Sequence, residues 1–146
     1  MSLVYWDSML FVYLVERHTA YFSVTKSLHE AMMRRGDTLC TSIVTVGEVL
    51  VGPRKLGSQS GADRVLSFFA AGTVRVLPFD METANQFSFV RAWTTASPPD
   101  AIHLASAAKA QVDLFFTNDR KLLSLQIPGI ARIASLDLQT VTRLLP

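Results

Sequence analysis

Short apolar runs bounded by polar, glycine or proline residues recur along the whole chain. Such runs, rich in β-branched and aromatic residues, are typical of strands that are buried on both faces of a sheet. The runs that fit this description predict about five strands, at Leu3–Trp6, Thr38–Ser42, Val74–Leu77, Leu114–Thr117 and Ile130–Ala134.

The longer segments between these runs carry apolar residues at helical spacing. They predict helices at Met9–Val15, Tyr21–Arg35, Ile43–Val51, Ala62–Ala71, Met81–Thr95, Asp100–Ala110 and Asp137–Leu144. Ser42 and Asp80 stand where helix caps are expected. Gly52 and Pro53 are expected to end the third helix, and Arg54–Gly61 is expected to be the most mobile loop of the chain.

Strands that alternate with helices imply an α/β fold, in which helices cover both faces of a parallel sheet. The length of 146 residues suits one domain that spans residues 1–146. In folds of this kind the functional site lies at the carboxyl ends of the strands. Glycine-rich loops of the dinucleotide-binding and P-loop kinds are absent from the sequence, which excludes the commonest nucleotide-binding functions.

The composition excludes several further classes of protein. Hydrophobic residues make up 49% of the chain and charged residues 18%, so an ordered core is expected. A formal net charge of +2 permits a polyanionic partner without indicating one. Cys40 is the only cysteine and is expected to be an inert core thiol. No apolar run reaches the length of a membrane span and no signal peptide is visible, so we expect a cytoplasmic protein.

Four acidic residues stand out by their positions relative to the predicted elements. Asp7 follows the first strand and Asp119 follows the fourth. Asp100 lies in the first turn of a helix that enters from the same side, and Glu48 lies halfway along a largely apolar helix. Because the carboxyl ends of parallel strands meet at one edge of a sheet, at least three of these carboxylates are expected to lie close together.

Each acid also has an ordinary structural interpretation. Asp7 and Asp119 could be helix caps, Asp100 could be a first-turn acid favoured by the helix dipole, and Glu48 could face solvent. Taken together these interpretations are weaker, because clustered carboxylates repel one another unless a cation or a proton intervenes. Magnesium or manganese is the natural cation for a site of oxygen ligands.

A carboxylate site of this kind, with a hard divalent ion, suits the hydrolysis of phosphoesters, because the ion binds phosphate oxygens and activates a water. Ser8, Thr117 and Asn118 add short polar side chains beside the acids and are candidates for holding water or substrate. Arg120 could contact a phosphate backbone, although it could equally be a solvated surface cation. His103, one helical turn from Asp100, is interpreted as a satisfied structural residue.

Three pieces of the sequence carry a resemblance to a known family. They read VYWDSMLFVYLVE around Asp7, TSIVTVGEVLVG around Glu48, and PPDAIHLASAAKAQVDLFFTNDRKL around Asp100 and Asp119. In this order and spacing the chain resembles the PIN domain, most closely the VapC-like ribonuclease toxins of prokaryotic toxin–antitoxin pairs. The third piece is the most specific, and the resemblance covers essentially the whole chain. The Pro98–Pro99 pair is a departure, because the family often carries a less rigid segment there.

The resemblance implies a three-layer α/β/α fold with a central, mainly parallel sheet of about five strands. It also implies a magnesium- or manganese-dependent endoribonuclease, with Asp7, Glu48, Asp100 and Asp119 as its acidic site. In such a site Asp7 and Asp100 are the surest metal ligands, while Asp119 and Glu48 complete the ligand set or position the water. Proteins of this kind usually form homodimers and are neutralised by an antitoxin protein that enters the acidic groove.

Two other functions compete with an RNA-cleaving toxin. A phosphatase or phosphoryl-accepting domain requires a lysine at a strand end, and the nearest candidate, Lys121, lies on the wrong side of Asp119. A catalytically inactive PIN-fold module that binds RNA or a partner protein is the main alternative. The intact set of acids argues against it, because a binding protein gains nothing from a repulsive cluster that faces a polyanion.

Overall fold

A five-stranded parallel sheet forms the centre of the computed structural model, which describes residues 1–146. The strand order is β3–β2–β1–β4–β5, and every neighbouring pair is parallel. The strands are β1 (Leu3–Trp6), β2 (Thr38–Ser42), β3 (Arg75–Leu77), β4 (Val112–Thr117) and β5 (Ile130–Ser135). The predicted number of strands is therefore confirmed, and the sheet is parallel throughout.

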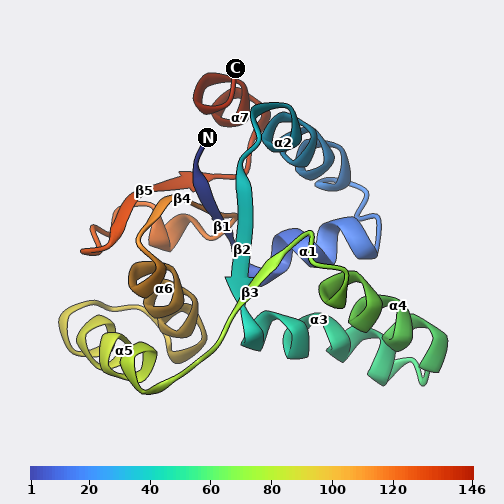
Figure 1. Cartoon of the computed structure of the whole chain (residues 1–146), viewed down its shortest axis with the longest axis horizontal. Coiled ribbons are helices and arrows are strands. Elements are labelled where there is room, and N and C mark those ends of the chain that lie inside the picture. Colours follow the sequence, from blue (N-terminus) through green and yellow to red (C-terminus); the bar gives the residue numbers. More distant parts are fainter.

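Helices cover both faces of this sheet, so the predicted three-layer α/β/α architecture is confirmed (Figure 1). They are α1 (Ser8–Val15), α2 (Phe22–Arg35), α3 (Ile43–Lys55), α4 (Gln59–Ala70), α5 (Met81–Trp93), α6 (Pro98–Ala110) and α7 (Leu138–Leu144), with a short 3-10 helix, η1 (Arg120–Leu122). One core cluster joins the sheet to α1, α2, α3, α4 and α7, and a second joins it to α5 and α6. No helix is both long and apolar enough to cross a membrane.

The central strand β1 divides its side chains between these two cores. Val4 and Trp6 belong to the first cluster, whereas Tyr5 belongs to the second, and all three are fully buried. This alternation follows from the two-residue period of a strand, and the absence of charged residues follows from burial on both faces. The strand therefore delivers the residue that follows it, Asp7, to a fixed place at the edge of the sheet.

Caps predicted from the sequence are present at the starts of helices. The Ser42 side chain accepts a hydrogen bond from the backbone N–H of Val44, and Asp80 accepts one from the N–H of Thr83. The departure at Pro98–Pro99 has a simple local role, because proline is well suited to the first turn of a helix, where its missing N–H has no partner. The two prolines thus begin α6 two residues before its predicted start.

The region around Pro53 differs from its prediction. Helix α3 does not stop at Gly52 but continues to Lys55, and α4 begins at Gln59. A proline this close to a helix end removes only one backbone hydrogen bond, because it lacks an N–H, so the last turn still forms. The expected loop is reduced to a tight turn at 56–58, closed by hydrogen bonds from the Ser58 N–H to the Pro53 carbonyl and from the Gly61 N–H to the Ser58 hydroxyl.

Candidate active site

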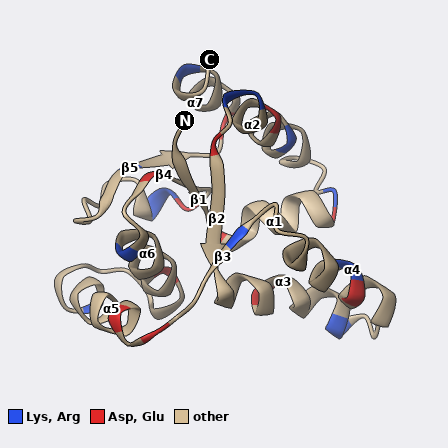
Figure 2. Ribbon diagram, in the orientation of Figure 1, with Lys and Arg blue, Asp and Glu red and all other residues tan.

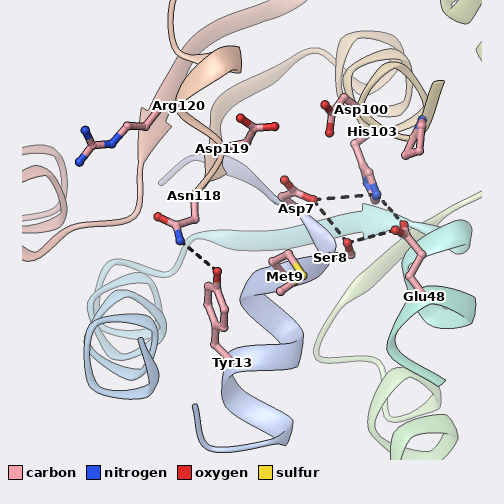
Figure 3. Close-up of a pocket in the computed structure, with 11 residues that line it drawn as sticks. Asp7, Ser8, Met9, Tyr13, Glu48, Asp100, His103, Asn118, Asp119 and Arg120 are labelled. Carbon is pink, nitrogen blue, oxygen red and sulfur yellow. Dashed lines mark hydrogen bonds and ion pairs between the residues drawn. The ribbon is translucent and has the colours of Figure 1, made fainter. Parts of the chain in front are cut away.

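All four acids predicted from the sequence line one cavity of about 440 Å³ at the carboxyl edge of the sheet (Figure 3). Asp7 follows β1 and Asp119 lies just beyond the end of β4, and these two strands are neighbours. Asp100 reaches the cavity from the first turn of α6, and Glu48 from α3. The sequence argument about strand ends therefore placed Asp7 and Asp119 at the same edge of the sheet, as the structure has them.

Asp7 is held by the strand beside it. Its Oδ2 accepts a hydrogen bond of 2.9 Å from the Thr117 hydroxyl, and only 8% of the residue is exposed. Asp7 occupies the cap position of α1, yet its side chain makes no cap hydrogen bond. The carboxylate is thus directed into the cavity, and helix capping does not account for it.

Asp119 lines the cavity and also makes the cap hydrogen bond that its structural interpretation predicted. Its Oδ1 accepts a hydrogen bond of 3.0 Å from the backbone N–H of Lys121 and so caps η1. Its own N–H donates to the Thr117 hydroxyl at 3.0 Å. Thr117 therefore bridges the two acids that follow β1 and β4. Thr117 is fully buried and does not line the cavity, so it is placed to support the two acids.

Asp100 carries the electrostatic signature of a crowded carboxylate. Partial burial raises its pKa above the usual 3.8, and the negative charges of Asp119 and Asp7 raise it further. A hydrogen bond of 3.0 Å donated by the Ser97 hydroxyl and the proximity of His103 lower the pKa without cancelling the rise. The carboxylates of Asp100 and Asp119 point toward each other above Asp7 (Figure 3). Such mutual repulsion is relieved when a cation binds between the groups.

Glu48 meets His103 instead of the other acids. Its Oε1 lies 2.7 Å from Nε2 of His103, and the same nitrogen lies 3.9 Å from Oδ1 of Asp7. The Glu48 side chain is 38% exposed, whereas that of His103 is 3% exposed. Burial lowers the pKa of His103, but the hydrogen bond with Glu48 and the charges of Asp7, Glu48 and Asp100 outweigh burial, so the net pKa is raised.

The sequence interpretation of His103 is therefore incomplete. The imidazole is buried and hydrogen-bonded, as a satisfied structural residue should be, but it also lines the acidic cavity. A signal was available in the sequence, because His103 follows Asp100 by three residues and such pairs share one face of a helix. Tyr13 also lines the cavity and is a residue that the sequence did not single out.

The remaining candidates occupy the floor and rim of the cavity. The Ser8 hydroxyl lies 3.4 Å from both Asp7 Oδ1 and Glu48 Oε2. The Asn118 amide donates a hydrogen bond of 3.0 Å to the Tyr13 hydroxyl. Arg120 is the only Lys or Arg among the lining residues, and its guanidinium points away from the acids (Figure 3). Elsewhere, Lys and Arg are spread over outer helices such as α2, α4 and α7 (Figure 2).

The oxygen atoms that face the cavity are of the type that a hard divalent ion prefers. The cavity presents carboxylate oxygens from Asp7, Asp100 and Asp119, which are the ligands that magnesium and manganese prefer. No three His, Cys, Asp or Glu side chains stand close enough to share one ion in the present arrangement. Partial burial first, and then the negative charges of Asp119 and Asp7, raise the pKa of Asp100, and a bound cation would neutralise this crowded negative charge.

Comparison with known proteins agrees with this geometry. A sequence model of the PIN domain matches residues 4–127, a span that includes all four acids. The chain belongs to the PIN-domain family. A comparison with curated protein sequences finds no match.

Solved structures with this PIN fold include toxins of bacterial toxin–antitoxin systems. VapBC2 from Rickettsia felis, bound to a promoter DNA fragment, aligns with a TM-score of 0.68 at 14% identity, over 92% of this chain and 99% of that one. VapC20 from Mycobacterium tuberculosis, described as a sarcin–ricin loop cleaving toxin, gives 0.68 at 16% identity, over 84% and 96%. A toxin–antitoxin complex from Klebsiella pneumoniae gives 0.64 at 22% identity, over 87% and 94%. At these identities the likeness is one of fold.

Proposed function

We propose that this PIN domain is a metal-dependent endoribonuclease, the toxin of a toxin–antitoxin pair, which hydrolyses phosphodiester bonds of RNA. The observation that carries the proposal is the convergence of Asp7, Asp100 and Asp119 on one cavity, with Asp7 turned away from the cap it could have made. Membership of the PIN family and the fold shared with a toxin described as cleaving the sarcin–ricin loop support the same function.

In this proposal Asp7, Asp100 and Asp119 hold magnesium or manganese, and each is oriented by a neighbour. The hydroxyl of Thr117 fixes Asp7, the hydroxyl of Ser97 fixes Asp100, and the backbone N–H of Lys121 fixes Asp119. A bound divalent ion lowers the pKa of a water ligand and stabilises charge on the phosphate oxygens. The neighbours restrict the carboxylates to orientations that face the cavity, so less ordering is needed when the ion binds.

The other lining residues act on the water and on the RNA. Glu48 presents Oε2 toward the cavity and is placed to orient the attacking water and accept its proton. Ser8 and Asn118 provide polar groups beside the reacting phosphate. Arg120 lies on the rim with its guanidinium directed away from the acids, so we assign it to an RNA phosphate outside the cavity.

The proposed partners follow from the same family. The related Klebsiella pneumoniae toxin was solved as a toxin–antitoxin complex, and FitAB was solved bound to a DNA fragment. We propose by analogy that this chain forms a homodimer in the cytoplasm and is neutralised by a cognate antitoxin protein.

Cleavage of a structured RNA tests the proposal. Wild-type protein should cut the RNA in Mg²⁺ or Mn²⁺ and should stop when EDTA is added. Asp7→Asn and Asp100→Asn should each lower the rate by roughly a hundredfold or more, since both remove charge from the ligand set. Asp63→Asn is the matched control, because Asp63 lies on α4 among exposed residues and hydrogen-bonds only within that helix.

Three outcomes separate the alternatives. Cleavage that persists in EDTA contradicts metal dependence. Cleavage that neither Asp7→Asn nor Asp100→Asn impairs contradicts the assignment of the acids. Binding of RNA or of a partner protein without any cleavage, across several RNAs, favours the catalytically inactive PIN-fold module.

A further inference from the structure

A buried hydrogen-bond chain leads from β2 to the acidic cavity through Tyr5 and His103. Tyr5 lies on β1, is fully buried, and stacks on Phe115 with ring centroids 5.0 Å apart and planes within 4°. Its hydroxyl accepts a hydrogen bond of 3.1 Å from the backbone N–H of Ser42 and lies 2.7 Å from Nδ1 of His103. Stacking and burial leave the phenol little freedom to move.

The first hydrogen bond of this series has a fixed direction, and the directions of the other two depend on the tautomer of His103. A backbone N–H only donates, so the phenol oxygen of Tyr5 is the acceptor toward Ser42. Burial raises the pKa of Tyr5 well above its usual 10, so the phenol keeps its proton. Nδ1 of His103, 2.7 Å from the phenol oxygen, is an acceptor within reach of that proton. A neutral imidazole that accepts it carries its own proton on Nε2, which then donates to Oε1 of Glu48 at 2.7 Å.

A proton on Nε2 of His103 restrains Glu48, the residue proposed to accept the proton of the attacking water. Glutamate has several rotatable bonds, and Glu48 is partly exposed on α3, so an unrestrained side chain would sample many rotamers. The Nε2–H of His103 fixes one oxygen, Oε1, and leaves Oε2 facing the cavity at 3.4 Å from the Ser8 hydroxyl. One oxygen of Glu48 is thus held by His103, and the other, which accepts only a long hydrogen bond from the Ser8 hydroxyl, keeps a lone pair for water.

We propose that Tyr5 and His103 are positioning residues, which use the Nε2–H tautomer of His103 to hold Glu48 as a directed acceptor for the attacking water. The proposal rests on the proposed nuclease function for its catalytic meaning. The tautomer itself belongs to the metal-free protein and can be measured without any RNA.

Nitrogen NMR of the histidine side chains tests the tautomer. Long-range ¹H–¹⁵N spectra of metal-free protein at pH 9 distinguish Nδ1–H, Nε2–H and doubly protonated rings. The chain has three histidines, and the spectrum of His103→Gln identifies the signals of His103. We expect the Nε2–H tautomer in the wild type and a mixture of tautomers in Tyr5→Phe, whose ring fits the same space but cannot donate. Tyr21→Phe is the control, because it removes a phenol hydroxyl that takes no part in the hydrogen bonds between Ser42, Tyr5, His103 and Glu48.

Kinetics provide the second readout. Tyr5→Phe should lower kcat for RNA cleavage by about tenfold, with KM changed by less than about twofold, as is usual when a group that orients an active-site ligand is lost. His103→Gln should retain part of the activity, because its amide can still donate to Glu48, whereas His103→Leu should not.

The NMR spectra and the kinetics can each contradict the positioning proposal without the other. An Nδ1–H or doubly protonated His103 at pH 9, or a Tyr5→Phe variant with an unchanged spectrum, overturns the positioning proposal even if RNA is cleaved. Equal kcat in Tyr5→Phe and wild type overturns it as well. If no RNA is cleaved by any form, the nuclease function fails, while the spectra still decide whether the hydrogen-bond chain exists.

Discussion

The Thr117 hydroxyl hydrogen-bonds both acids that follow β1 and β4, so removing it tests directly what holds these acids in place. The hydroxyl donates to Asp7 Oδ2 at 2.9 Å and accepts from the Asp119 N–H at 3.0 Å, in a fully buried position. Thr117→Val keeps the shape of the side chain and deletes both hydrogen bonds. Loss of the hydrogen bond to the Asp7 carboxylate costs about 1.5–3 kcal/mol. Leaving the Asp119 N–H without its acceptor costs about 1 kcal/mol more.

The free energy of unfolding of metal-free Thr117→Val should therefore fall by roughly 2.5–4 kcal/mol relative to wild type. For a chain of this length that corresponds to a decrease in Tm of roughly 5–16 °C. Urea denaturation followed by circular dichroism measures the change. RNA cleavage should fall as well, because Asp7 is no longer fixed toward the cavity.

Thr117→Ser is the matched control, because it keeps the hydroxyl and loses one methyl group, at a cost of about 0.8 kcal/mol. The serine variant should be more stable and more active than the valine variant. A valine variant within about 0.5 kcal/mol of wild type, or a serine variant that loses more stability than valine, would refute the reasoning about this hydroxyl.

Three further predictions concern other parts of the chain. Arg120→Gln should weaken binding of RNA in EDTA and lower the slope of log K against log salt by about 0.7, as expected when one phosphate contact to a single strand is lost. Burial raises the pKa of the Cys40 thiol to about 12, so Ellman's reagent at pH 8 should label this residue only after unfolding. A hydrogen bond from Lys109 lowers the pKa of Asp80 below its usual 3.8. The interaction of ionised Asp80 with Lys109 therefore stabilises the fold above pH 3.8, and this stabilisation is lost as the pH falls below that value. The stability gap between wild type and Asp80→Asn, measured by urea denaturation, should accordingly be largest near neutral pH and close in acid; a gap that widens in acid would contradict the sign.

Much of the fold follows from patterns that are local in sequence. The five strands are short apolar runs because both faces of the sheet are covered, and this pattern is visible without knowledge of the partners. The continuation of α3 through Pro53 was not predictable from residue preferences, because glycine and proline usually end helices. Its last turn depends on the tight turn that follows, where Ser58 hydrogen-bonds back to the Pro53 carbonyl.

The part of the site that depends only on the topology of the sheet was predictable from the sequence. Asp7 and Asp119 follow strands, and parallel strands end at one edge, so their convergence required no knowledge of side-chain packing. The roles of Thr117 and His103 did require it. Whether Thr117 reaches substrate or lies beneath Asp7 depends on the register of β1 against β4. Likewise, the contact of His103 with Tyr5 and Glu48 joins three elements that are distant in the sequence.

Titration of Mn²⁺ into metal-free protein tests the central claim, that Asp7, Asp100 and Asp119 share a divalent ion, most directly. Calorimetry or the electron paramagnetic resonance of free Mn²⁺ would report the affinity. The account predicts saturable binding by wild type and by Asp63→Asn, and affinity at least about tenfold weaker in Asp7→Asn and in Asp100→Asn. Binding should also release protons, because the pKa of Asp100 is raised in the metal-free protein. No saturable binding by wild type, or equal affinity in wild type and both Asn variants of the site, would contradict the account.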